Sequence, residues 1–458
     1  MEGVVGIRSW LVPLLLLLLA APVGAVVRHV STGGSDGGND CTDSALPCAT
    51  LQHAVDQALP GDVILVAPGV YNQTLRIRNQ QDLTINALGA TLRPDLATVG
   101  SADSEQGSTC SGSPGRSIVL VRDSTGIVFN GLSIDGSAAF MAPGETARWA
   151  GIYYRQSSGT IFGGSVTHLR TEPLSGNQVA GIGIVVQTEP QGIDPPPAVD
   201  IVGVSITDFQ KTGILITGCN CAAGYGPTGS VRGVSVVSEP TGLLARNGIQ
   251  VSLGARGVRL ESNVASGMRF TGNPAAGLGS AIILVSTRDN ELLRNRALDS
   301  NFGIVNIGIL DPVCVPRAQE NLRNVFRCNE ILNNETGMSI DNDTSVIQEN
   351  SFAGNTAVPP TGAALFTRSY YQGADADATF NWWGSPTGPT NPANPGGTGD
   401  VVDDRVDFTP FLTAPPLCAN NSIDEIPTLP PAGLIALGAL LAGAAWVLLR
   451  RQAPGSAG

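Results

Sequence analysis

The sequence predicts an all-β protein built as a right-handed parallel β-helix, a solenoid of stacked coils, with a short N-terminal capping helix. Three observations predict this fold class. Short runs rich in β-branched residues alternate with Gly, Asn and Asp turns over most of the chain. A phrase of glycine followed by alternating apolar residues returns at intervals of about 30 residues, which is typical of solenoids. Charged residues make up 14% of the chain, against roughly 25% in ordinary soluble domains, so few exposed helix faces are expected.

Residues 1–25 are predicted to be a secretory signal peptide rather than part of the fold. Arg8 lies in a short basic start, Leu11–Ala21 is apolar, and Val23-Gly24-Ala25 offers small residues for cleavage. The alternative is a first transmembrane helix. The apolar core is short for that role, because a membrane span needs about 20 residues. An exported protein is therefore expected.

The β-helix is predicted over residues 26–412, with a capping helix at Thr50–Leu59. The apolar residues of this helix share one face, because they are spaced i, i+3, i+4, i+7 and i+8. They are Leu51, Ala54, Val55, Ala58 and Leu59. Thr50 is a natural N-cap, and Pro60-Gly61-Asp62 is typical of a helix end. The helix is expected to cover the first open edge of the solenoid, and Trp382-Trp383 with the following residues the other.

Repeated phrases mark the coils. A first short strand is expected at Val63–Val66. The glycine phrase then begins at Gly126, Gly151, Gly181, Gly213, Gly248, Gly303 and Gly337, and Ser280-Ala281 replaces it once. Asn295 and Asn329 stand at the same offset before Gly303 and Gly337. Turn chemistry explains an asparagine but not this fixed spacing, so the two amides are predicted to stack at one corner of successive coils.

Eight cysteines in an exported chain favour disulfides. Cys41 and Cys48 bracket a short loop and are predicted to close it. Cys314 and Cys328 are predicted to link neighbouring coils. The pairing of the others is left open; they are Cys110, Cys219, Cys221 and Cys418.

The C-terminal end predicts sorting to a membrane. After a linker at 413–425, residues 426–458 contain an uncharged apolar stretch at 432–449, followed directly by Arg450 and Arg451. This stretch is long enough to span a bilayer, and the basic pair would remain on the cytoplasmic side. A plain membrane anchor explains this much.

The residues before that stretch carry a more specific signal. Ile426, Pro427, Thr428 and Leu429 precede the span, and Arg450-Arg451 follows it. This order resembles the IPTL-type C-terminal sorting signals of Gram-negative bacteria. The resemblance implies a processing protease as a partner, and a chain held at the cell surface or released from it.

Both ends of the predicted solenoid resemble secreted right-handed β-helix proteins of the pectate-lyase-like superfamily. The motifs that carry the resemblance are Asp40-Cys41, Pro47-Cys48, Ala67-Pro68-Gly69-Val70-Tyr71, Asn381-Trp382-Trp383-Gly384 and Val406-Asp407-Phe408-Thr409-Pro410. With the coils between them, the resemblance covers roughly residues 30–412. It implies the architecture but not the activity, because one fold hosts many functions.

Candidate catalytic residues are few. A glycoside hydrolase needs two carboxylates at a set separation, and a calcium-dependent lyase needs several oxygen ligands and a base. Arg368 with Asp375 and Asp377 could begin such a lyase site, with calcium bound by the two aspartates. The alternative is an exposed acidic loop, since Asp is ordinary in turns. Of Tyr153-Tyr154, at most one ring can face outward to stack on a sugar, since neighbouring strand residues face opposite sides.

The function predicted is that of an exported, surface-sorted β-helix protein without catalytic activity, an adhesin or a binder of extracellular glycan. The alternative is a polysaccharide-degrading enzyme on the same fold, a lyase rather than a hydrolase. Nucleic acid is not an expected partner. The net charge is −12 and Lys211 is the only lysine, whereas phosphate binding needs clustered basic residues.

Overall fold

The computed structural model describes residues 24–101, 103–108, 113–142, 147–174, 181–189, 195–218, 226–239, 243–272, 279–308, 322–340, 344–356, 365–367 and 376–419. The chain divides into two units, Met1–Ala419 and Asn420–Gly458. The second unit lies outside the described residues. The predicted signal peptide, except Gly24 and Ala25, and the predicted tail at 426–458 with its span at 432–449 also lie outside them. Within the described ranges, no helix has both the length and the apolar character needed to cross a membrane.

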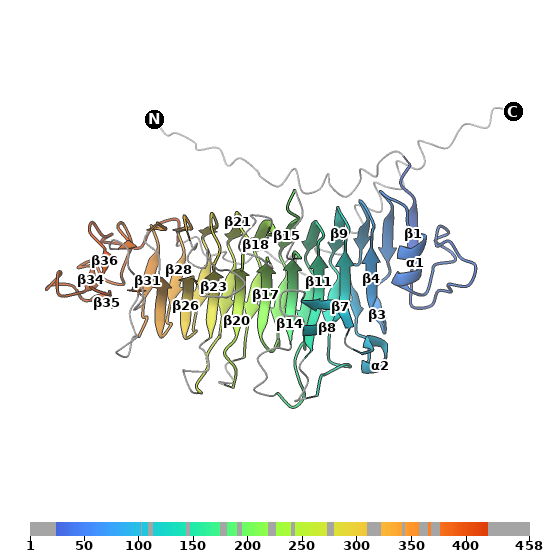
Figure 1. The fold of residues 1–458 in the computed structure, drawn as a ribbon, viewed down its shortest axis with the longest axis horizontal. Coiled ribbons are helices and arrows are strands. Elements are labelled where there is room, and N and C mark those ends of the chain that lie inside the picture. The colour runs from blue at the N-terminus through green and yellow to red at the C-terminus, as the bar shows by residue number, and fades with distance from the viewer. Residues whose placement is uncertain are drawn as a thin grey trace, which may run out of the picture. The chain divides into compact units, whose positions relative to one another are not determined.

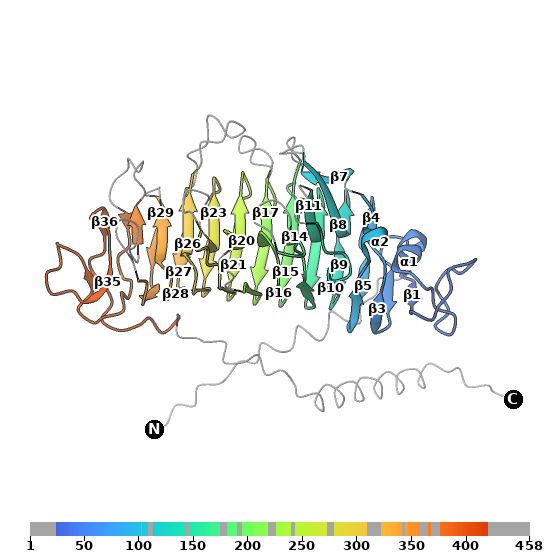
Figure 2. The same cartoon turned by 90° about the horizontal axis from the view of Figure 1, so that it is seen from below.

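The first unit is a parallel β-helix, consistent with the predicted right-handed form, in which most coils contribute one strand to each of three sheets (Figures 1 and 2). Sheet A consists of β1 (Val27–Val30), β2 (Val63–Val66), β5 (Thr84–Asn86), β9 (Ile127–Asn130), β12 (Gly159–Phe162), β15 (Ala198–Val202), β18 (Thr228–Arg232), β21 (Val258–Glu261), β24 (Glu291–Leu293), β27 (Val325–Arg327) and β30 (Val346–Gln348). Sheet B consists of β3 (Gly69–Tyr71), β6 (Ala90–Leu92), β10 (Ser133–Asp135), β13 (Ser165–Thr167), β16 (Ser205–Thr207), β19 (Ser235–Val237), β22 (Val264–Ser266), β25 (Arg296–Leu298), β28 (Glu330–Leu332) and β31 (Ser351–Ala353).

Sheet C faces the other two and carries the longer strands. It consists of β4 (Leu75–Arg78), β8 (Ser113–Arg122), β11 (Arg148–Arg155), β14 (Ile182–Gln187), β17 (Thr212–Thr217), β20 (Asn247–Ser252), β23 (Ser280–Val285), β26 (Phe302–Ile307), β29 (Thr336–Ile340) and β32 (Leu365–Thr367). β7 (Asp103–Ser108) pairs antiparallel with β8. The remaining elements are the helices α1 (Leu51–Gln57) and α2 (Leu96–Val99) and two small C-terminal sheets, β33 (Ala376–Asp377) with β36 (Val406–Asp407) and β34 (Pro389–Thr390) with β35 (Gly399–Val401).

The glycine phrase marks the inner face of sheet C. The residue after the glycine is paired from coil to coil in one register, and every member is buried; the column is Ile152, Ile184, Ile214, Ile249, Ile282, Ile304 and Met338. The glycines are needed because the coils approach closely: a Cβ on Gly213 would lie 2.7 Å from the Gly248 carbonyl oxygen. Two glycines of the predicted series do not belong to this column. Gly126 precedes β9 in sheet A, and in the third phrase the glycine equivalent to Gly151 is Gly183 rather than Gly181.

The predicted capping helix is confirmed, although it ends two residues early. Thr50 is its N-cap and accepts a hydrogen bond from the His53 amide, and the chain leaves the helix at Ala58, which is extended at ψ 142°. Leu51, Ala54 and Val55 are buried, and α1 lies against β1, β2 and β4 at the first end of the solenoid (Figure 1).

A buried ion pair joins the first coil to the second beneath this cap. The Arg28 guanidinium donates to Asp62 Oδ2 through Nε at 3.1 Å and through Nη2 at 2.9 Å. The same carboxylate accepts hydrogen bonds from the Val26 and Leu59 amides. Both charged side chains are less than one tenth exposed, so Asp62 ties β1, the end of α1 and the start of β2 together.

The predicted asparagine ladder is present and is longer than expected. Each side-chain oxygen accepts from both the amide and the Nδ2 of the asparagine one coil before it, which runs the ladder through Asn263, Asn295, Asn329, Asn350 and Asn381. All five are fully buried. A second ladder runs from Asn334 through Asn355 to Asp400. Stacking of the coils buries these corners away from water, and the ladders supply hydrogen-bond partners for the buried polar groups.

The last coil is closed by Trp383, as expected. Its ring stacks on Phe352 with centroids 4.7 Å apart, and both side chains are fully buried. The segment that follows returns to the last coil, because the Leu412 amide donates to the Asn381 carbonyl.

One of the two predicted disulfides is confirmed and the other is wrong. Cys41 is bonded to Cys48. Cys328 is bonded to Cys418, across a sequence separation of 90 residues, instead of to Cys314. The prediction favoured partners in neighbouring coils and did not foresee that the C-terminal segment folds back. Cys314, Cys110, Cys219 and Cys221 lie outside the described residues.

Non-reducing peptide mapping should recover a peptide that joins Cys328 to Cys418. Replacing Cys418 with serine is expected to lower the free energy of unfolding by as much as about 4.5 kcal/mol, since the cross-link closes a long loop in the unfolded chain. Replacing Cys41 opens a shorter loop and should cost less. A peptide joining Cys328 to Cys314 in the native protein would contradict the pairing.

Candidate functional site

Of the three residues predicted for a lyase site, Asp377 alone lies in the described part of the chain. Arg368 and Asp375 lie outside the described part of the chain. Asp377 is exposed in β33, and its Oδ1 accepts hydrogen bonds from the amide and the hydroxyl of Thr379. These are the contacts of an Asp that stabilises a local turn, which was the alternative interpretation.

The pair Tyr153-Tyr154 leaves no open ring for a sugar. Tyr154 points into the core and donates to the Ile127 carbonyl. Tyr153 faces outward from sheet C but is 3% exposed, and its hydroxyl donates to Gln187 Oε1 at 2.8 Å. Burial raises the pKa of Tyr153 to about 12. Leu120, Val185 and Leu215 share this second apolar cluster on the outer side of sheet C.

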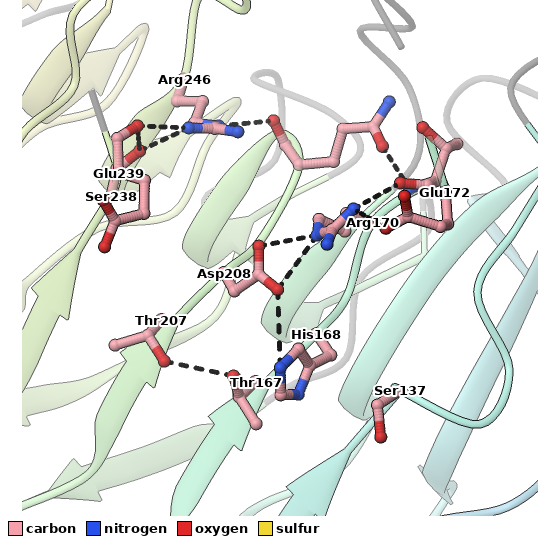
Figure 3. A network of polar contacts seen from close by, with 12 residues as sticks. Ser137, Thr167, His168, Arg170, Glu172, Thr207, Asp208, Ser238, Glu239 and Arg246 are labelled. Atoms are coloured by element: carbon pink, nitrogen blue, oxygen red, sulfur yellow. Dashed lines mark hydrogen bonds and ion pairs between the residues drawn. The ribbon is translucent and has the colours of Figure 1, made fainter. Parts of the chain in front are cut away.

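A group of ionisable side chains lies where the chain passes from sheet B to sheet C in three successive coils. We call it the His168 cluster; its members are Asp135, His168, Arg170, Glu172 and Asp208. Figure 3 shows the last four of these. Asp135 ends β10, His168 follows β13 and Asp208 follows β16. His168 and Asp208 have φ of 58° and 46°, so both occupy the left-handed turn conformation that sharply redirects the chain.

The imidazole of His168 lies between two carboxylates. Its Nδ1 is 2.8 Å from Asp135 Oδ1, and its Nε2 is 3.7 Å from Asp208 Oδ2. The His168 side chain is 39% exposed, so a ligand can reach it. Burial raises the pKa of Asp135, but hydrogen bonds from Ser137 and His168 outweigh burial and hold the pKa below its usual value. The Asp135 carboxylate is therefore charged at neutral pH.

Arg170 closes the other side of the cluster. Its Nε lies 2.8 Å from Asp208 Oδ1, and its Nη1 donates to Glu172. Its guanidinium also lies over the Phe140 ring at 4.7 Å, and that ring meets His168 edge-on. Burial lowers the pKa of Arg170, but Asp208 and Glu172 reverse this and raise it.

A buried arginine supports the turn that carries Asp208. Arg246 is 5% exposed and donates to Ser238 Oγ, to the Glu239 carbonyl and to the Gln210 carbonyl. Gln210 Oε1 in turn accepts from the amide of Thr171. The contacts tie three coils together behind the cluster (Figure 3). Asp208 and Arg170 are thus held on a rigid base rather than on an unsupported loop.

The cluster can bind a polar molecule and can exchange protons. With Arg93, which approaches Asp135 Oδ2 at 4.0 Å, it holds three carboxylates, two guanidiniums and one imidazole. The carboxylates accept hydrogen bonds, and a histidine held by a carboxylate is a common acid or base. The imidazole separates Asp135 from Asp208, so the two carboxylates do not face each other across an open gap.

Sequence reasoning missed this cluster. Neither His168 nor the two aspartates, Asp135 and Asp208, were singled out. A signal was present: Ser133-Ile134-Asp135, Ser165-Val166-Thr167 and Ser205-Ile206-Thr207 share one pattern. Aligning them would have placed His168 and Asp208 at the same offset after their strands.

Two cysteine groups have the residue types of a metal site but not its chemistry. Cys41 and Cys48 lie near His53, and Cys328 and Cys418 near Glu349. Both cysteine pairs are disulfides, and metals bind the thiolate.

No family model matches the chain, and no curated protein matches it. Solved structures resemble it in fold. A GH136 lacto-N-biosidase from Eubacterium ramulus is 14% identical with a TM-score of 0.48, and the match covers 78% of this chain and 66% of that one. Pectate lyase Pel9A is 13% identical with a TM-score of 0.41, covering 74% and 83%. The Dettilon tailspike protein is 17% identical with a TM-score of 0.40, covering 78% and 61%. This chain thus spans slightly less than two thirds of that lacto-N-biosidase, and the likeness concerns the parallel β-helix fold alone.

Proposed function

We propose that this protein is exported, is sorted to the cell surface through residues 426–458, and binds an extracellular glycan at the His168 cluster. One observation carries the glycan part: three successive coils bring a histidine, carboxylates and an arginine to one accessible place. Charged and planar polar groups of this kind form the directed hydrogen bonds that fix a polar ligand. The rigid support from Arg246 reduces the ordering cost of binding.

Binding without turnover is the function that the contacts favour. Arg170 Nε and Nη1 are already directed at Asp208 and Glu172. Asp135 and Asp208 are bridged by His168, whereas a hydrolase needs its two carboxylates on either side of the scissile bond. The cluster is therefore built for recognition, by an adhesin or a glycan-binding protein.

A polysaccharide-degrading enzyme is the second candidate, and a specific observation favours it. His168 is partly exposed and hydrogen-bonded to Asp135, which is the arrangement that orients a histidine as a general base. A lyase would use such a base to remove a proton from a sugar ring. In that case His168, rather than Asp377 or Arg368, is the catalytic residue.

The test is a binding screen on soluble polysaccharides, with and without calcium, using three variants. Asp208→Asn removes the carboxylate that holds Arg170 and approaches His168, and it should weaken glycan binding about tenfold or more. His168→Gln should do the same. Asp289→Asn is the matched control, because Asp289 forms an ion pair with Arg323 away from the cluster; it should leave binding unchanged.

Each outcome of the screen separates the candidates. Equal binding by wild type and Asp208→Asn, or no binding at all, would contradict the proposal. Release of reducing ends or unsaturated products that is lost in His168→Gln would replace the binding protein with an enzyme at the same place. Thermal unfolding of each variant checks that the fold is kept.

A further inference from the structure

The outer face of sheet B carries a row of hydroxyl groups. The strands are parallel and in register, so residues at equivalent positions line up along the axis of the solenoid; the row is Thr91, Ser133, Ser165, Ser205 and Ser235. The Ser165 hydroxyl donates to the Ser133 hydroxyl at 3.2 Å, which confirms that neighbouring members are within hydrogen-bonding distance. Neighbouring strands repeat at about 4.8 Å. The row is therefore an evenly spaced series of donors and acceptors.

A second, shorter row lies beside the first and leads into the His168 cluster. It is formed by Asp135, Thr167 and Thr207, each two residues after a member of the first row. The Thr207 hydroxyl donates to the Thr167 hydroxyl at 3.2 Å. His168 directly follows Thr167 and Asp208 directly follows Thr207, so the cluster borders this row (Figure 3). Ser205 and Thr207 are exposed.

The outer faces of the other sheets differ from this surface. On sheet C, the outward Leu120, Tyr153, Val185 and Leu215 are buried. On sheet A, β21 and β24 carry the ion pairs of Arg259 with Glu261 and Glu291, and the later strands β25 and β28 of sheet B carry the pair of Arg296 with Glu330. Among the described outward residues of β6, β10, β13, β16 and β19, Asp135 is the one charged side chain, and it is engaged by His168 and faces Arg93. The hydroxyl face is thus uncharged over most of its length.

We propose that the occupant of this face is a linear, uncharged polysaccharide that lies along the solenoid axis and passes beside the His168 cluster. The inference rests on the proposed glycan-binding function and adds the class of ligand and its direction. Evenly spaced hydroxyls both donate and accept, which matches the hydroxyl-rich edge of a repeating sugar chain. An acidic polysaccharide needs cations for its carboxylates, whereas Arg170 is already paired with Asp208 and Glu172.

The experiment compares a soluble neutral β-glucan with alginate, an acidic polysaccharide, by isothermal titration and affinity electrophoresis of the full chain. The probe variant is Thr167→Val with Thr207→Val, which removes two hydroxyls while keeping side-chain shape. The control is Thr160→Val, since Thr160 occupies an outward position of β12 on sheet A in the same coil as Thr167. We expect the neutral glucan to bind, the double variant to bind about tenfold more weakly, and the control to bind as the wild type does.

Three results would overturn the inference. Binding of alginate but not of the neutral glucan would reject the ligand class. Binding of the neutral glucan that is lost in Asp208→Asn but kept in the double variant would show that the hydroxyl rows are not the binding surface. The proposed function would stand. Binding of neither polysaccharide class by the folded wild type would reject both proposals.

Discussion

Replacing Asp62 with alanine is expected to destabilise the N-terminal coils by about 3–5 kcal/mol. The change leaves the Arg28 guanidinium buried without its carboxylate and removes the acceptor of the Val26 and Leu59 amides. An unpaired buried charge is far more costly than the pair itself is stabilising. The loss of stability is measured by urea unfolding of the full chain and, separately, by hydrogen exchange of the amides in β1 and β2.

A matched control separates burial from charge. Glu291→Ala breaks the more exposed pair of Arg259 with Glu291 and should cost less than about 1 kcal/mol. Replacing both Arg28 and Asp62 with apolar residues should recover much of the lost stability, because neither charge then remains buried. Equal costs for Asp62→Ala and Glu291→Ala would show that the buried pair is not a structural link.

The same carboxylate gives the stability of this end a dependence on pH. Burial raises the pKa of Asp62, but the Leu59 and Val26 amides and Arg28 outweigh burial and lower the pKa below 3.8. A folded pKa below the unfolded one contributes stability that is full above the unfolded value and is lost as pH falls through the folded value. The wild type should therefore lose stability below about pH 4, and Asp62→Ala should lose less over that range.

Replacing Asn329 with alanine is expected to cost about 3–5 kcal/mol, the other large effect. Its Oδ1 accepts from the amide and the Nδ2 of Asn295, and its Nδ2 donates to the Leu292 carbonyl and to Asn350 Oδ1. Alanine leaves these buried partners unsatisfied at the centre of the ladder. Asn329→Asp should also destabilise, because a carboxylate replaces the amide that donates to two oxygens.

The control for the ladder is Asn130→Ala. Asn130 also donates from its side chain to an asparagine, Asn86, but on the outer face of sheet A, where water replaces the lost bond. It should cost less than about 1 kcal/mol. Chemical denaturation with hydrogen exchange across β24, β25, β27 and β28 measures both variants. A cost for Asn329→Ala no larger than that for Asn130→Ala would mean that the ladder does not hold the coils in register.

The coils were predictable because each one repeats a short residue pattern that can be recognised in the sequence. The apolar residues that share one helix face predicted α1, and the fixed offset of Asn295 and Asn329 predicted the ladder. The phrase at Gly126 was grouped with the phrases of sheet C because strands of sheet A can show the same pattern of glycine and apolar residues. Its position in the coil, not its composition, decides which sheet it joins.

The wrong disulfide and the missed His168 cluster share one physical cause: they concern residues brought together by the stacking of coils or by the C-terminal segment that folds back. Cys418 reaches Cys328 only because the C-terminal segment folds back onto the last coil. Asp135, His168 and Asp208 meet only because three coils are in register. Such contacts depend on the length of every intervening turn, which a single sequence does not reveal.

The asparagine ladder also shows where this chain can change its length. Consecutive members are separated by 32, 34, 21 and 31 residues, yet each pair forms the same bonds. The corner between sheets A and B therefore has the same geometry in each of these coils, and the turns that flank sheet C account for the differences in coil length. Insertions grafted into those turns should be tolerated, and one inserted between Arg294 and Arg296 should not be. A chain of this design can acquire new loops around sheet C by duplication and insertion while its scaffold stays unchanged.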